Sequence, residues 1–339
     1  MMRIVLTIAL AACAMACASI QTFAQNISNS IAPVVQATHA DEVQGLIQKL
    51  QSQTPQERAA AACALGRMET RGAAAIPALA GLLSDGASVK KTCGYESPFE
   101  DEEWQPEYET VKETTVGEAA TQALIAVGPA SLDALIDNLT TNASWRGRKN
   151  AAWALAHRGN AQAMQQMLVA LKDEAWQVRA EAAYALFQRG GAKEETVNAL
   201  IAATRDEAWQ VRQQATAALG HKGSSKVDVA ETLMHLLRED KDARVRGEAA
   251  WGLRQMANGR LFPTLLEALK DENDAGVRNR IAETLGHRAG NDEVPLLIAA
   301  LKNENAHVRA GAKAALKIVK VRSQGTTTYL KPLPPGIPE

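Results

Sequence analysis

Apolar residues along this chain follow two helical patterns that alternate. In one pattern, seen at residues 163–171, 261–269 and 294–301, apolar side chains recur every three or four positions, which is the period of a helix. In the other, seen at residues 178–186, Ala is frequent, a Leu closes the segment, and a Gly follows nearby. The alternation predicts a series of helix pairs.

The Ala-rich pattern is a repeat. It consists of an acid or amide, four spacers, Val-Arg, two spacers and Ala-Ala-x-Ala-Leu. From Arg148 onward its Arg recurs at intervals of 31, 33, 34, 32 and 31 residues. The copies carry Arg58, Arg148, Arg179, Arg212, Arg246, Arg278 and Arg309, and one more copy ends in Leu124 with Gly117 in place of the Arg. Since one pair cannot bury its apolar face alone, the sequence predicts a single elongated all-α domain, an α-α superhelix (solenoid) of about eight helix pairs over residues 41–320.

The repeated Arg lies six residues after a hydrogen-bond acceptor, at the expected turn into the second helix of each pair. From the third repeat on, the acceptors are Asn142, Asp173, Asp206, Asp240, Glu272 and Asn303. A guanidinium has the rigid fork that suits such groups, so we expect a ladder that ties neighbouring repeats together. A column of anion-binding guanidiniums is the alternative.

The repeated D-E-x-x-x-V-R-x-x-A-A-x-A-L and the L-K-D-E at 171–174 and 269–272 resemble HEAT repeats of the phycobilisome-lyase type. They are also similar to designed binding scaffolds built from that consensus. The resemblance covers roughly residues 41–320 and implies the fold, whereas function depends on sites carried by the fold.

In the designed scaffolds, the spacer positions around Val-Arg form the binding surface, which is usually concave. Helix geometry agrees, because these positions face away from the Ala and Leu side chains. The aromatic residues there are Trp145, Trp153, Trp176, Tyr184, Trp209 and Trp251, and their polar neighbours include Arg146, Gln177, Gln210, Gln213 and Arg244. Five of the six Trp thus fall on one surface of a chain with 4% aromatic residues, which predicts a binding surface. Alternatively, these rings cover helix ends and pack on each other.

Histidines stand nine residues after the repeated Arg, at His157, His221 and His287. They lie about two repeats apart, too far to share one metal ion. The chain contains no nucleophile elbow, phosphate loop or HExxH motif. We therefore expect no catalytic residue, metal or cofactor.

Deoxyhypusine hydroxylase, a HEAT-repeat enzyme, holds two irons with His-Glu dipeptides that follow the repeat Arg. Here Glu181 and Glu248 occupy the Glu positions, but Ala180 and Gly247 replace the His. A HEAT-repeat enzyme of the lyase or metal-dependent hydroxylase type remains the alternative function.

The two ends of the chain differ from the repeats. Residues 1–24 are typical of a secretory signal peptide, with Arg3, an apolar run and small residues at the cleavage position, and residues 25–40 form a linker. The motif around Cys13 resembles a lipobox, so a lipid anchor is the alternative. Residues 321–339 form a Pro-rich tail. We therefore expect export to a bacterial periplasm or cell envelope.

An acidic insertion at residues 86–115, rich in Glu and aromatic residues, interrupts the second repeat. After cleavage only Cys63 and Cys93 remain, and they form a possible disulfide between the first repeat and this insertion. The insertion either borders a groove or is a solvated loop, and its carboxylates lack EF-hand spacing.

Charge is balanced, with 37 basic and 38 acidic side chains, which argues against nucleic acid as a partner. No later stretch is apolar enough for a transmembrane segment. The sequence thus predicts a non-enzymatic exported scaffold for a protein or peptide partner and leaves the oligomeric state open.

Overall fold

The computed structural model describes residues 39–90, 113–158, 160–189, 193–222, 227–254, 256 and 261–325. Contacts group the chain into two compact bodies, residues 1–134 and 135–339, with the boundary inside one helix. The described residues are almost all helical, which confirms the predicted all-α solenoid.

The N-terminal body contains the first two repeats. Residues 39–49 are helical and precede α2 (Pro55–Arg67). The second repeat runs from η1 (Glu69–Ala75) and α3 (Ile76–Gly81) to α4 (Val116–Val127), which packs on α2. Gly128 ends α4 at φ 102°, a left-handed conformation that a side chain would strain. The short η2 (Pro129–Ser131) follows.

The acidic insertion begins and ends in two short strands that the sequence did not predict. β1 (Ser88–Lys90) pairs antiparallel with β2 (Glu113–Thr115), with Val89 opposite Thr114. Their three-residue length explains why no period-2 pattern marked them. Thr115 then caps α4 in a reciprocal pair of hydrogen bonds with Glu118. The residues between the strands, 91–112, lie outside the described part.

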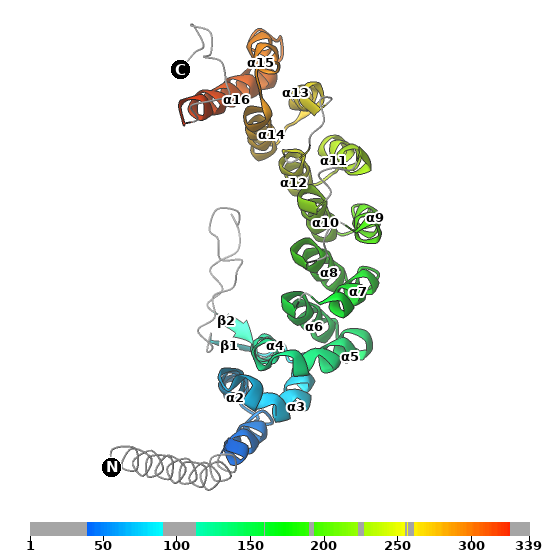
Figure 1. Ribbon diagram of the computed structural model, residues 1–339, viewed down its shortest axis with the longest axis vertical. Helices are drawn as coiled ribbons and strands as arrows, with labels where there is room; N and C mark the ends of the chain where they lie inside the picture. Colours follow the sequence, from blue (N-terminus) through cyan, green and yellow to red (C-terminus); the bar gives the residue numbers. More distant parts are fainter. Residues whose placement is uncertain are drawn as a thin grey trace, which may run out of the picture. The chain divides into compact units, whose positions relative to one another are not determined.

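The C-terminal body contains the other six repeats in two layers of helices (Figure 1). First helices form one layer: α5 (Leu132–Thr141), α7 (Ala161–Ala170), α9 (Glu194–Ala203), α11 (Val227–Glu239), α13 (Leu261–Asp271) and α15 (Val294–Ala300). Second helices form the other: α6 (Trp145–Arg158), α8 (Trp176–Arg189), α10 (Trp209–Lys222), α12 (Ala243–Leu253), α14 (Ala275–Arg288) and α16 (Ala306–Gly325). Each second helix packs on the next, so this layer is continuous.

Helix α16 continues to Gly325, so the expected tail does not begin at residue 321. Residues 321–325 contain no Pro, and Arg322 donates from Nη1 to the carbonyl of Gly286, which holds this last turn on α14. The predicted signal peptide, most of the predicted linker and the rest of the predicted tail lie outside the described residues.

The core consists of the Ala and Leu side chains that define the repeat. The Leu seven places after the repeated Arg is at most 1% exposed in every repeat, from Leu65 to Leu316. Small residues let second helices approach closely: a Cβ on Gly220 would lie 2.5 Å from the Cα of Gly252 on the next helix. These contacts are the physical reason for the Ala-rich pattern.

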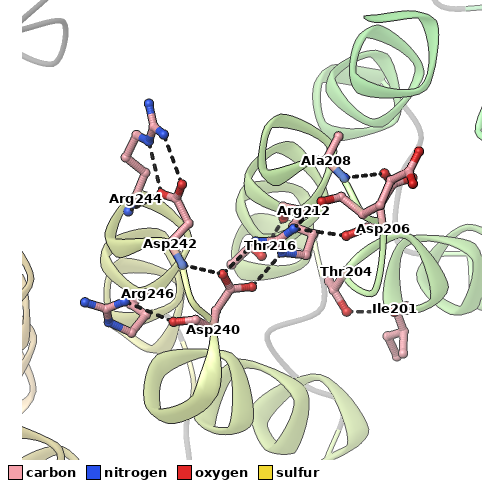
Figure 2. Close-up of polar contacts among 11 residues, drawn as sticks. Ile201, Thr204, Asp206, Ala208, Arg212, Thr216, Asp240, Asp242, Arg244 and Arg246 are labelled. Carbon is pink, nitrogen blue, oxygen red and sulfur yellow. Dashed lines mark hydrogen bonds and ion pairs between the residues drawn. The ribbon is translucent and has the colours of Figure 1, made fainter. Parts of the chain in front are cut away.

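The repeated Arg forms the expected ladder (Figure 2). Arg212 donates from Nη1 to the carbonyls of Asp206 and Glu207 in its own repeat, and from Nε and Nη2 to both carboxylate oxygens of Asp240 in the next repeat. The side chains of Arg212 and Asp240 are 6% and 5% exposed, and the hydrogen bond to Asp240 raises the pKa of Arg212. Asp240 also accepts from the backbone nitrogen of Asp242, which shapes its turn.

The same pairing joins Arg58 to Asp85, Arg148 to Asp173, Arg179 to Asp206, and Arg246 to Glu272. One detail differs from the prediction: each acidic acceptor from Asp173 to Glu272 contributes its carbonyl to the Arg six residues later, and its side chain to the Arg of the preceding repeat. In the repeat after Arg278, the acceptor position holds an amide, Asn303, instead of an acid. Among the described residues, Arg278 therefore bonds only within its own repeat, to the carbonyls of Glu272 and Asn273.

Candidate functional site

Three Trp side chains open three consecutive second helices. Trp145, Trp176 and Trp209 are the first residues of α6, α8 and α10, at the same position of the repeat. Arg146 lies over the ring of Trp145, with its Cζ 4.7 Å from the centroid, and Arg244 lies over Trp209 at 3.3 Å. We call these three rings the Trp row.

The middle ring of the Trp row differs from its neighbours. Trp176 is 38% exposed and makes no ring contact or hydrogen bond within the described part of the chain. Trp145 and Trp209 are only partly exposed. The row therefore presents one open indole between two that a guanidinium covers on one face.

Asp242 holds Arg244 in its place over Trp209. It accepts from Nε and Nη2 of Arg244 at 3.0 Å each, and from the Arg244 backbone nitrogen at 3.0 Å (Figure 2). The hydrogen bond from Arg244 lowers the pKa of Asp242. Because both oxygens of Asp242 bind Arg244, the stack is preorganised at this end of the row.

Other aromatic rings pack against each other in the C-terminal halves of the second helices. Tyr184 and Phe187 on α8 have centroids 6.1 Å apart, Phe187 and His221 on α10 are 4.7 Å apart, and His221 and Trp251 on α12 are 4.7 Å apart. This series crosses three repeats. It matches the expectation that some of these rings pack on each other, and it explains why Tyr184 and Trp251 are only partly exposed.

Sequence reasoning missed Phe187, which connects this aromatic series. Phe187 directly follows the core Leu186, so the repeat pattern gives its position no outward direction. Trp153 also uses its ring locally, in an edge contact with His157 at 5.1 Å. Trp153 and Tyr184 thus contact rings of their own helices, whereas the Phe187–His221 and His221–Trp251 contacts join neighbouring helices.

Amide side chains lie next to the Trp row. Gln177 and Gln210 follow Trp176 and Trp209 in the chain, and Gln213 lies one turn further along α10. All three are partly exposed, and none makes a side-chain hydrogen bond within the described residues. Unlike Gln188, which donates to the hydroxyl of Tyr184, they keep donors and acceptors free for a bound molecule.

Helix α8 also carries a buried carboxyl group. Oε1 of Glu181 on α8 is buried and has no hydrogen-bond partner in the described structure. Burial raises the pKa of Glu181 to about 7, and the charge of Lys149 on α6 only partly opposes this rise. Burial also raises the pKa of Glu248 at the same repeat position on α12, where Arg280 opposes it. These are the two Glu residues that the comparison with hydroxylases singled out.

A cavity of about 660 Å³ lies between α9 and α11, in the layer of first helices. Its lining includes Ile201, Thr204, Thr232, His235 and Leu236, together with the ladder residues Asp206, Arg212 and Asp240. The repeat pattern does not predict this cavity, because the cavity depends on the gap between two first helices. Its acids at the ladder are already bound by Arg side chains.

Metal ligands do not gather in groups of three or more among the described residues. Cys63 is buried in α2 and is disulfide-bonded. Its expected partner, Cys93, lies outside the described part, so the pairing with Cys93 stays a prediction. In the described helices, none is both long and apolar enough to span a bilayer.

Comparison with known proteins identifies the repeat. The family model for HEAT repeats matches residues 132–220 and 230–317, and the model for the PBS lyase HEAT-like repeat matches residues 57–85. These matches cover more than half of the chain, which therefore belongs to the HEAT-repeat proteins, with a repeat of the PBS-lyase-like type. No curated protein matches the sequence.

Solved structures agree on the fold. The chain is similar to the X-ray structure of YibA from Escherichia coli, with a TM-score of 0.52, 19% identity, and coverage of 81% of this chain and 92% of YibA. It also matches the complex of CpcE and CpcF of phycocyanin lyase from Nostoc sp. PCC7120, with a TM-score of 0.38, 23% identity, and 46% and 98% coverage. Human deoxyhypusine hydroxylase in complex with glycerol gives a TM-score of 0.33, 21% identity, and 84% and 98% coverage. At 19% identity, the likeness to YibA shows the fold alone.

Proposed function

We propose that this protein is an exported, non-enzymatic HEAT-repeat scaffold that binds a protein or peptide partner through the Trp row and its amide neighbours. The observation that carries the proposal is Trp176. Its indole is 38% exposed and makes no ring contact or hydrogen bond in the described structure, although it lies between two partly covered Trp rings.

Physical chemistry supports a binding role for this part of the surface. An indole offers a large apolar face and one N–H donor at a small cost in conformational entropy, so exposed Trp residues often dominate the energy of an interface. Ring contacts within the protein account for Tyr184, which meets Phe187, and for Trp251, which meets His221, whereas Trp176 has no such contact in the described structure. Residues 1–24 have the composition of an export signal. This composition supports localisation in the periplasm or cell envelope.

The direct test is capture of a partner from cell-envelope extract by the purified chain and by the variant Trp176→Ala. A matched control is Val169→Ala, because Val169 is an apolar residue 58% exposed on the first-helix layer. Circular dichroism establishes that both variants keep the helical fold. Each captured protein is then titrated in purified form against the same variants.

The proposal predicts a purified partner whose affinity falls by about tenfold or more with Trp176→Ala and stays unchanged with Val169→Ala. Equal affinity of the partner for all three proteins would show that the Trp row is not the binding surface. A purified chain that carries a bound metal or pigment would favour an enzyme instead.

A further inference from the structure

The Trp row has a regular spacing set by the repeat. Its three rings belong to the first residues of adjacent second helices. The axes of helices that pack side by side lie about 8–10 Å apart. The residue that follows each Trp in the chain has a side chain that donates hydrogen bonds: Arg146, Gln177 or Gln210. The row is therefore a linear array that offers one apolar ring and one donor at each step.

A polyproline II helix has a matching period. It has three residues per turn with a rise of about 3.1 Å each, so every third residue returns to the same face after about 9.3 Å. Its backbone carbonyls make no internal hydrogen bonds and accept from donors on a binding surface. A segment with Pro at every third position would thus place one Pro ring on each Trp and its carbonyls near the donors.

The chain itself contains such a segment. Its C-terminal residues carry Pro332, Pro335 and Pro338, three prolines each three positions apart, and Pro334 stands outside this register. We propose that the Trp row binds residues 332–338 of a second copy of this chain as a polyproline II helix. This inference rests on the proposed function and assigns the partner of the same surface.

The reach of the tail excludes binding to its own Trp row. The last described turn, at Gly325, ends the 20-residue helix α16, so it lies about 30 Å from the N-terminal edge of the second helices, where the Trp row is. Six residues lie between Gly325 and Pro332, and a fully extended chain over these seven residue steps spans about 25 Å at most. Three second helices from α10 to α16 add further distance along the stack. A tail in register with the three rings must come from another molecule.

The test is sedimentation velocity of the full chain over a range of concentrations, with the variants Trp176→Ala and Pro335→Ala. The matched control is Pro334→Ala, which removes a proline of the same tail from outside the register. We expect the unaltered chain to self-associate with increasing concentration, Trp176→Ala and Pro335→Ala to weaken association about tenfold, and Pro334→Ala to leave it within about twofold.

A synthetic peptide of residues 326–339 provides the second measurement, through its fluorescence anisotropy on addition of the full chain. Binding that is lost with Trp176→Ala supports the assignment. A chain that stays monomeric at all concentrations, or equal effects of Pro334→Ala and Pro335→Ala, overturns it. If an envelope partner requires Trp176 but the peptide does not bind, this inference fails and the proposed function stands. If Trp176→Ala changes neither interaction, both fail.

Discussion

Replacement of Glu181 by Gln tests how the buried carboxyl group affects stability. In the folded chain, burial raises the pKa of Glu181 from its ordinary value of 4.5 to about 7. Between these two pH values the folded state binds more protons at this position than the unfolded state does. The free energy of unfolding therefore decreases as pH rises from about 4.5 to 7, and the loss is complete above the folded pKa. Gln cannot ionise and does not suffer this loss.

The size of the effect follows from the pKa difference. Each pKa unit corresponds to about 1.4 kcal/mol, so the rise costs the folded protein at most about 3 kcal/mol at pH 8. Glu181→Gln should match the parent chain near pH 4.5 and exceed its stability by an amount approaching this limit at pH 8. Relaxation of the helices around the charge, or a contact with Lys149, would reduce the difference.

Urea unfolding followed by far-UV circular dichroism, from pH 4.5 to pH 8, measures this difference. The control Glu231→Gln removes the same charge from an exposed position on α11. Because repeat arrays can unfold in steps, the comparison holds where the urea dependence is equal among the variants. Parallel stability curves for the parent and Glu181→Gln over this pH range would refute the argument that Glu181 is forced to ionise in a buried position.

Three further results are expected. In urea unfolding, Arg212→Ala should lower the free energy of unfolding by about 3–5 kcal/mol because it leaves the buried carboxylate of Asp240 without its ion pair. Arg309 bonds carbonyls of its own turn, so Arg309→Ala should lower it by about 1 kcal/mol. Gly220→Ala should destabilise by more than 1 kcal/mol, since its Cβ would meet backbone at 2.5 Å, whereas Gly247→Ala, with its nearest atom at 3.7 Å, should stabilise by up to about 1 kcal/mol. Mass spectrometry of the secreted chain should show cleavage after Ala24, and an intact N-terminus would exclude that processing.

Much of the fold followed from the sequence because its determinants are local. A period of 31 to 34 residues, the 3.6-residue spacing of apolar side chains and the Leu after each Arg all report on one helix pair and its immediate neighbour. For the same reason, the regular pattern could not show what interrupts it. The strands at the base of the insertion are too short for a periodic signal, and α16 runs on because its last turn bonds to α14.

The candidate site was predictable in position but only partly in exposure. Helix geometry placed Trp176 and Tyr184 on the outward side of one helix, yet Tyr184 packs toward Phe187 while Trp176 stays open. The amphipathic pattern shows only toward which side of its helix each side chain points. How far a neighbouring helix covers a given ring depends on the distance and rotation between the two helices, which the pattern does not contain.

The sequence by itself thus determined the kind of fold, the order of the helix pairs, the Ala and Leu core and the Arg that ties the repeats, because each depends on contacts within about one repeat length. Only the tertiary structure decided which atoms meet across repeats. It assigned Arg212 to Asp240 rather than to the side chain of its own turn, covered Trp209 with Arg244 and buried Oε1 of Glu181 without a hydrogen-bond partner among the described residues. These outcomes depend on distances between neighbouring helices, and packing sets such distances to within fractions of an ångström.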